Sequence, residues 1–295
     1  MALARRSRPL HTALAAVGAV AALALGACSS GTTAASGSQS TGATQSGAAG
    51  AALPTVAQGK LTIATGQPAY SPWVENDDPA SGQGYEAAVA YAVADKLGFT
   101  KNDVVWTRTT FDAAIAPGAK DWDLNLQQFS ITDERKQAVD FSSPYYTTAQ
   151  AVVTVEGSKA ASAASIAGLA DIQFGVQVGT TSQTTITNTI KPKKDALVFN
   201  SSQDTVQALK GGQVDAIVVD LPTALYLVAS ELDKGKVVGQ FADTTGGDKY
   251  GIVLPKGSEL TTPVSKAVDE LQADGTLAEL QKKWLSDSVN VPVLK

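Results

Sequence analysis

The 295-residue sequence is poor in reactive side chains, with one cysteine, one histidine and one methionine. A single cysteine excludes an internal disulfide, so the fold must depend on its hydrophobic core. So little histidine and cysteine argues against Ser-His-Asp or Cys-His catalysis, and leaves a carboxylate site for a hard cation as the one type of metal site to consider. We therefore expect no cofactor and no metal. The net charge of −5 provides no basic surplus for phosphates, so we also expect no nucleic-acid partner.

The first 27 residues have the features of a removable targeting segment. Three arginines precede an Ala/Val/Leu-rich stretch from Thr12 to Leu25, which is short for a bilayer span. The stretch ends in Leu-Gly-Ala-Cys, which resembles a lipobox, the motif at which a new N-terminal cysteine is acylated. We expect residues 1–27 to be a lipoprotein signal peptide and Cys28 to carry a lipid. An ordinary signal peptide and a short membrane anchor are the alternatives.

The expected mature chain starts as a linker. Removal of the leader takes away three arginines and no acid, so the net charge falls from −5 to −8. Residues 28–58 consist mainly of Ser, Gly, Thr, Ala and Gln, which cannot bury enough apolar surface to fold. We expect a flexible tether here, followed by a globular part from about Gly59 onward.

Apolar bursts alternate with amphipathic stretches in the globular part, and this alternation predicts an α/β fold. Strands are expected at 60–64, 104–108, 124–128, 151–155, 173–177, 216–219, 237–241 and 250–254. Helices are expected at 86–97, 182–190, 202–210, from 222 onward, 260–273 and 276–285. Length alone allows one large domain or two smaller ones.

Residues 128–146 form the most informative segment, which reads QFSITDER, a short polar gap, and then DFSSPYY. An apolar run gives way to the hydroxyls of Ser130 and Thr132 and then to Arg135. Ligands prefer such strand ends in open α/β sheets. A guanidinium can also grip a carboxylate through two parallel hydrogen bonds. Taken alone, the residues also allow a surface arginine that pairs with Asp140.

This segment resembles the ligand-binding signature of bacterial solute-binding protein family 3, the amino-acid-type substrate-binding proteins that feed ABC importers. The resemblance implies a two-lobed, periplasmic-binding-protein-like (type II) α/β fold. Two crossing hinge strands would lie near 151–155 and 249–253. Lobe 1 would comprise residues 59–151 plus 249–295, and lobe 2 would be the inserted residues 152–248.

The resemblance also implies how an amino acid would be held. Arg135 and Ser130 would bind its carboxylate, and Gln128 would help to hold its ammonium, largely through the backbone. Asp220 follows a strand that is apolar on both faces, and it would bind the ammonium from the other lobe. A buried zwitterion needs a partner for each charge, so only closure of both lobes would satisfy it. The residues alone equally allow Asp220 to cap the helix that starts near Pro222.

Four further positions match the family pattern less specifically. Thr181, in a Gly-Thr-Thr turn, would add a donor to the carboxylate site, and Gln177 would face the ligand side chain. Tyr70 and Trp73 follow the first strand, where an aromatic ring lies against the aliphatic part of the ligand. Both are equally explained as core or rim aromatics.

One departure from the family pattern bears on the ligand. Many members have an aspartate three residues before the first aromatic, and Gln67 stands there in this chain. Its loss weighs against lysine, arginine or histidine as ligand, and favours a neutral polar side chain. Glu75, Asp77 and Asp78 are close enough in sequence to restore a negative pocket. Glutamines near the expected site also include Gln127, Gln128 and Gln177.

The expected function is therefore capture and delivery. An extracytoplasmic lipoprotein, tethered to the cell membrane by its lipid, would bind a polar, uncharged L-amino acid and present it as a monomer to the permease and ATPase of an ABC importer. Two alternatives remain open. One is an enzyme on the same fold, a carboxylate-based dehydratase or lyase with Glu75 as its base. The other is a ligand-sensing lipoprotein that serves a separate receptor.

Overall fold

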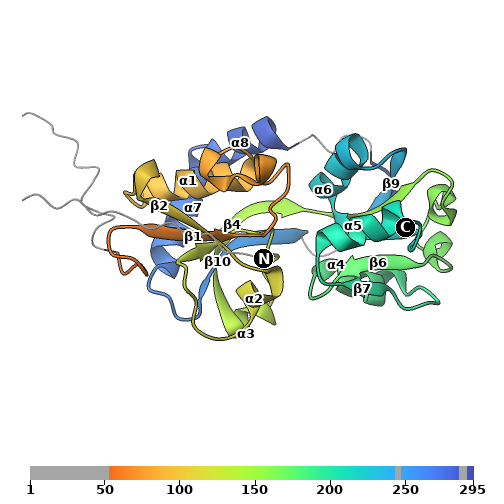
Figure 1. Cartoon of the computed structure of the whole chain (residues 1–295), viewed down its shortest axis with the longest axis horizontal. Helices are drawn as coiled ribbons and strands as arrows, with labels where there is room; N and C mark the ends of the chain where they lie inside the picture. Colours follow the sequence, from red (N-terminus) through yellow and green to blue (C-terminus); the bar gives the residue numbers. More distant parts are fainter. Residues whose placement is uncertain (1–52, 243–246, 286–290) are drawn as a thin grey trace, which may run out of the picture. The chain divides into compact units, whose positions relative to one another are not determined.

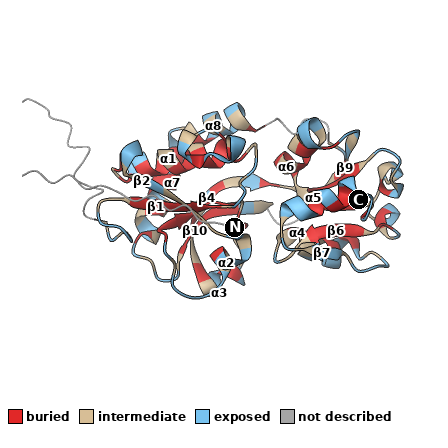
Figure 2. Cartoon of the chain, viewed as in Figure 1, coloured by how far each residue is buried: buried red, intermediate tan, exposed pale blue. Residues whose placement is uncertain are grey.

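The computed structural model describes residues 53–242, 247–285 and 291–295. The expected signal peptide, Cys28 and most of the expected linker lie outside the described residues. The described part contains two β-sheets with helices packed against them (Figure 1). Most strands are buried, whereas helices expose one side (Figure 2). No helix in these ranges combines the length and the apolar character needed to span a bilayer.

The first sheet has the strand order β2-β1-β3-β10-β4. Strands β1, β2 and β3 run parallel, and β10 is antiparallel to both of its neighbours. Its strands are β1 (Leu61–Thr65), β2 (Val104–Arg108), β3 (Leu124–Asn125), β4 (Val139–Thr148) and β10 (Asp248–Pro255). Its helices are α1 (Tyr85–Lys96), α2 (Phe111–Ile115), α3 (Arg135–Ala138), α7 (Thr261–Ala273) and α8 (Thr276–Trp284).

Alternation along β1 explains how this sheet buries both faces. Leu61 and Ile63 point to the cluster formed with α1, α7 and α8, which lie together on one side of the sheet (Figure 1). Ala64 points the other way, into a smaller cluster with Ala114 of α2. Every residue of β1 is thus buried and both faces of the strand are covered, as is usual for parallel strands.

The second sheet has the strand order β11-β9-β5-β8-β6-β7. Its strands are β5 (Gln150–Val155), β6 (Phe174–Gln177), β7 (Leu197–Phe199), β8 (Ala216–Asp220), β9 (Gly235–Phe241) and β11 (Val293–Leu294). Its helices are α4 (Thr181–Thr185), α5 (Ser202–Lys210) and α6 (Leu221–Tyr226), of which α4 and α6 continue as the π-helical turns η7 (Ile186–Ile190) and η8 (Leu227–Glu231). Val152 and Val218 face one apolar cluster, and Val153 and Ile217 face the other. The prediction of a strand apolar on both faces at 216–219 matches β8.

Two of the passages between the sheets fall near the predicted hinge strands. The chain leaves β4 at Thr148 and enters β5 at Gln150, so the crossing lies just before the predicted 151–155, which belongs wholly to the second sheet. The return runs from β9 to β10, and β10 pairs along its whole length with β4. The second predicted crossing, 249–253, is therefore already part of the first sheet.

The C-terminal residues depart from the predicted division. The family resemblance predicts that residues 249–295 belong to lobe 1, but β11 pairs in parallel with β9 of the second sheet. The Gln240 N–H donates to the Pro292 carbonyl at 2.8 Å, and Leu294 is 2% exposed in the core of that sheet. A side chain at Gly239 would lie 2.7 Å from Leu294, so glycine permits this close approach. The chain therefore passes between the two sheets a third time, after α8.

Candidate functional site

A cavity of about 360 Å³ is lined by residues of both sheets. It lies at the carboxyl ends of β1, β6 and β8 and at the loop that follows β3, the edge at which open α/β sheets bind ligands. The nine residues predicted from sequence all line it: Gln67, Tyr70, Trp73, Gln128, Ser130, Arg135, Gln177, Thr181 and Asp220.

Arg135 begins α3 and is 8% exposed. Its guanidinium donates to the Ser130 carbonyl at 2.8 Å and to the Gly179 carbonyl, on the second sheet, at 2.9 Å. The guanidinium carbon lies 5.2 Å from the centre of the Phe111 ring. Among the described residues no carboxylate forms an ion pair with it. Asp140, the surface partner considered from sequence, pairs with a lysine instead.

This environment leaves a buried positive charge without a counter-charge. Burial lowers the pKa of Arg135, while Asp248 and Asp220 act in the opposite direction. Arginine nevertheless stays protonated, because its reference pKa is far above neutrality. A buried charge is costly unless it is paired, so the site is suited to an anion that enters from solvent.

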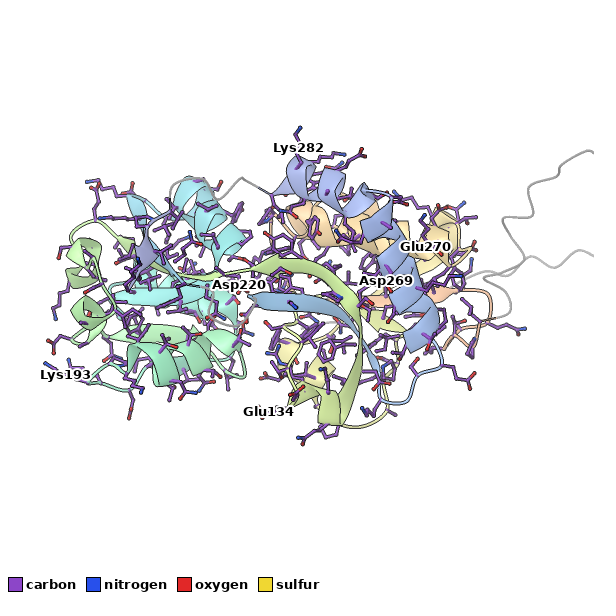
Figure 3. All side chains as sticks on the ribbon, turned by 180° about the vertical axis from the view of Figure 1, so that it is seen from behind. Glu134, Lys193, Asp220, Asp269, Glu270 and Lys282 are labelled. Atoms are coloured by element: carbon purple, nitrogen blue, oxygen red, sulfur yellow. The ribbon has the colours of Figure 1, made fainter. Side chains whose placement is uncertain are left out.

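Asp220 ends β8 and stands at the N-cap of α6, but its side chain makes no capping hydrogen bond. The capping interpretation is therefore wrong. Its Oδ1 atom is buried and has no hydrogen-bond partner in the described part of the chain. Burial raises the pKa of Asp220 to about 7, while the nearby Tyr250 hydroxyl lowers it. Figure 3 labels Asp220 beside the strands that link the sheets, and Gln150 of β5 is its register partner.

Thr181 belongs to a polar network between the sheets. Its hydroxyl donates to Asp248 Oδ2 at 2.9 Å, accepts from Gln150 Nε2 at 2.7 Å, and lies 3.4 Å from the Ser130 hydroxyl. Gln150 also donates to Asp248 at 2.7 Å. Sequence reasoning identified Ser130 and Thr181 but missed Gln150 and Asp248, which sit where the two linking strands meet the sheets.

The two aromatics have different environments. Trp73 is 2% exposed, packs edge-on against Tyr85 and Tyr250, and donates its indole N–H to Thr223 of α6 at 3.0 Å. It is therefore a core residue that also bridges the two sheets. Tyr70 is 38% exposed, and its hydroxyl donates to Gln203 at 3.4 Å. Burial of the hydroxyl raises the pKa of Tyr70 to about 12.

Apart from Arg135 and Asp220, the cavity lining is rich in amides. Gln177 accepts a hydrogen bond from the Ser202 hydroxyl at 2.6 Å. Lys210 and Glu231 are the other charged residues that line the described cavity, and they pair with each other at 3.2 Å. The amide residues that line it are Gln67, Gln127, Gln128, Gln177, Asn200, Gln203 and Gln207.

The three acids that could have made this surface negative do not line the cavity. Asp77 pairs with Arg108 and accepts the Ala69 N–H at 2.9 Å. Asp78 accepts the Ala80 N–H at 3.1 Å, and Glu75 accepts from a neighbouring serine hydroxyl at 2.8 Å. Glu75 is therefore also poorly placed to act as an elimination base.

Two residues near the cavity were missed from sequence. Phe111 stacks on Phe129 and lies under Arg135. Glu86, in the first turn of α1, is 1% exposed and accepts hydrogen bonds from Gln128 and Tyr145. An aromatic residue after a strand was a possible signal for Phe111. Glu86 resembles an ordinary acid at a helix start, and its contact with Gln128 spans 42 positions.

Two α/β lobes with a polar cavity between their strand ends define a binding protein of the periplasmic type. The sequence profile of the bacterial extracellular solute-binding proteins, family 3, matches residues 61–287. The chain belongs to this family.

Named relatives and a solved structure agree with this assignment. A probable histidine-binding protein of Campylobacter jejuni is 30% identical, over 77% of this chain and 86% of its own. The ABC transporter glutamine-binding protein GlnH of Bacillus subtilis is 28% identical, over 71% and 76%. The structure of an ancestral arginine-binding protein bound to glutamine is 32% identical, with a TM-score of 0.66, over 78% of this chain and all of its own. The predicted type II fold is confirmed, and so is the prediction of a solute-binding protein rather than an enzyme.

Proposed function

We propose that this protein captures a polar, uncharged L-amino acid between its lobes and delivers it to an ABC importer. One observation carries the proposal: Arg135 and Asp220, which carry opposite charges, line the same cavity, and neither forms an ion pair with another described residue. The Oδ1 atom of Asp220 also has no hydrogen-bond partner among them. An α-amino acid carries both complementary charges on one carbon. Its carboxylate would pair with Arg135 and its ammonium with Asp220, so that each buried charge gains its partner.

The contributing elements explain why binding and closure would be coupled. Arg135 and Ser130 follow β3 of the first sheet, while Asp220 and Thr181 lie on the second. A ligand shifts the balance between conformations only by its difference in affinity for them. An amino acid that needs contacts from both lobes would therefore favour the closed arrangement.

A neutral ligand side chain is supported by the amide-rich surface. Cavity-lining acids in the described ranges are Asp220 and Glu231, and Glu231 already pairs with Lys210. A cationic side chain would find no free carboxylate there, whereas an amide can both donate to and accept from glutamine side chains. We therefore propose glutamine or a closely similar amide as the ligand class. Relatives named for histidine and glutamine show that such specificity varies among similar proteins.

Delivery and location complete the proposal. The lipobox-like sequence at Cys28 supports a lipid anchor on the outer face of the cell membrane, and residues 28–58 would give the anchored protein reach. We propose that the monomer docks on a permease whose ATPase drives release. The name of the Bacillus relative, an ABC transporter protein, supports this partner.

A thermal-shift screen of residues 29–295 against the twenty amino acids, dipeptides and sugars tests the proposal. A ligand that binds only the folded state raises the melting temperature by linkage. We expect the largest rise with L-glutamine or L-asparagine. A rise with L-arginine alone would overturn the neutral side chain, and a rise with sugars alone would overturn the amino-acid site.

A further inference from the structure

Gln128 has an unusual backbone for a residue other than glycine. Its φ angle is 52°, in the left-handed region that side chains disfavour. The residue lies three positions after the end of β3 and lines the cavity two positions before Ser130. Its carbonyl accepts no hydrogen bond from the described residues, although the neighbouring Phe129 carbonyl accepts the Gly251 N–H at 3.0 Å. Something must hold this peptide in its disfavoured conformation, and its carbonyl remains available.

The Glu86 carboxylate holds the Gln128 peptide through hydrogen bonds. One carboxylate oxygen, Oε1, accepts the Gln128 backbone N–H at 2.7 Å, and the other accepts the Gln128 side-chain amide. The Tyr145 hydroxyl donates a third hydrogen bond to Oε1. Burial raises the pKa of Glu86 to about 7, while its bonds to Tyr145 and Gln128 lower it. The Glu86 carboxylate is thus buried at a cost in free energy. Two of its three hydrogen bonds come from Gln128.

Packing at the start of helix α1 fixes the position of the Glu86 carboxylate. Its N-cap is Gly84 at φ 98°, where an added side chain would lie 2.5 Å from the Trp73 carbonyl. The same carbonyl accepts the Glu86 N–H at 3.0 Å. The loop that contains Trp73 and the start of α1 therefore pack in direct contact, which fixes the position of Glu86. A role limited to the helix dipole would need no contact with Gln128.

We propose that Glu86 is a positioning residue for ligand binding: it fixes the left-handed Gln128 peptide so that the free Gln128 carbonyl is held toward the ligand ammonium. The inference rests on the proposed function, in which the Gln128 backbone helps Asp220 to hold the ammonium, and it adds the residue that fixes that backbone. Glu86 itself does not line the cavity and acts only through Gln128.

The first test needs no ligand. NMR hydrogen exchange of the Gln128 amide reports directly on its bond to Glu86. We expect slow exchange in the native protein and exchange about tenfold faster or more in Glu86→Gln and Glu86→Asp. Glutamine offers one neutral acceptor oxygen to two donors and aspartate is one methylene shorter, so both variants weaken the hydrogen bond that protects the amide. The Tyr145→Phe variant removes a different bond to the same carboxylate and is expected to keep the amide protected. Equal exchange in the native protein and both Glu86 variants would overturn the positioning role.

The second test separates positioning from charge. Calorimetric titration with L-glutamine is expected to give about tenfold weaker binding for both Glu86→Gln and Glu86→Asp. Glutamine has one acceptor oxygen for the two donors of Gln128, and the shorter aspartate cannot reach both, while only the first variant loses the charge. Tyr145→Phe is expected to stay within about twofold, since its bond does not reach Gln128. A loss in Glu86→Gln alone would point to charge and overturn the inference.

A double variant provides the sharpest comparison. Glycine adopts positive φ without help, so Gln128→Gly is expected to make position 86 unimportant. Gln128→Gly alone and Gln128→Gly combined with Glu86→Gln should bind glutamine equally, within about twofold. Multiplying losses would overturn the proposal. Should the native protein bind none of the twenty amino acids, the proposed function fails, and the exchange measurement still decides whether Glu86 fixes the turn.

Discussion

The two ends of the cavity differ in how they handle polarity. At one end, Arg135 is buried without a counter-charge, and the Oδ1 atom of Asp220 is buried without a hydrogen-bond partner among the described residues. At the other, glutamine and asparagine side chains are neutral, and the one charged pair, Lys210 with Glu231, is satisfied within the protein. Buried unpaired charge is far more costly than an exposed amide, so the first end defines the class of ligand. The second end distinguishes members of that class through smaller energies.

The largest effect is expected from Arg135→Ala. It would leave the ligand carboxylate buried and unpaired, at a cost of about 3–5 kcal/mol of binding free energy. Lys210→Ala is the matched control, because it removes a cavity-lining cation whose pair is solvent-exposed and worth about 1 kcal/mol or less. Calorimetric titration with L-glutamine measures both. Similar losses in the two variants would remove the distinction between the ends of the cavity.

Asp220→Asn is expected to weaken glutamine binding by about 1–3 kcal/mol, because a charge-assisted hydrogen bond becomes a neutral one of similar shape. The same change should raise the melting temperature of the ligand-free protein near pH 7. Burial disfavours the charged form of Asp220, and asparagine removes that charge. Loss of affinity together with gained stability is the expected signature. A variant that loses both would indicate general damage to the fold.

Glutamine affinity is expected to rise about tenfold between pH 6 and pH 8 and then level off. Burial raises the pKa of Asp220 to about 7, with Asp248 and Glu86 adding to the rise and Tyr250 and Arg135 opposing it. A bound ammonium favours the charged form, so binding below pH 7 must release a proton. Calorimetry in buffers of different ionisation enthalpy would detect that release. The profile should flatten in Asp220→Asn, and an unchanged profile would assign the proton to another group.

The smallest effect is expected at the neutral end. Gln67→Asp would introduce a partly exposed carboxylate and improve binding of L-arginine by about two- to fivefold, the range of solvent-screened ion pairs. Gln67→Asn is the control, because it has the shape of aspartate without the charge. Competition titrations of arginine against glutamine give the ratio. No shift in that ratio would show that position 67 does not face the ligand side chain.

Local signals in the sequence predicted the regular elements well. Helix α5 begins after Ser201, whose hydroxyl accepts the Asp204 N–H at 3.1 Å, and ends before Gly211. Strand β2 has the predicted bounds. The long strand β4 was missed because Pro144 and several polar residues interrupt its pattern. It forms because β10 pairs with it across register shifts, and because an edge strand tolerates proline.

Residues of the site could likewise be predicted from sequence where they are close together in the chain, but not where distant segments meet. Arg135 and Ser130 lie within one continuous motif, so sequence could propose them together. The network of Gln150 and Asp248 joins residues 98 positions apart, and neither carries a local signal. The three acids near Gln67 were candidates for a negative pocket because they are close in sequence, but their side chains turn to Arg108 and to backbone amides. Side-chain direction depends on tertiary contacts that composition does not encode.

Strand β11 makes the two lobes mutually dependent during synthesis. The first sheet is complete only when β10 has been made, and β10 follows the whole inserted lobe. The second sheet is complete only when β11 has been made, and β11 follows α8, the last helix of the first lobe. Neither sheet can be assembled from one uninterrupted stretch of chain. A truncation after α8 would leave β9 as a bare edge, with unpaired backbone groups and an uncovered Gly239, and such edges recruit other chains. A C-terminal boundary for expression should therefore retain β11, and removing it is expected to favour aggregation.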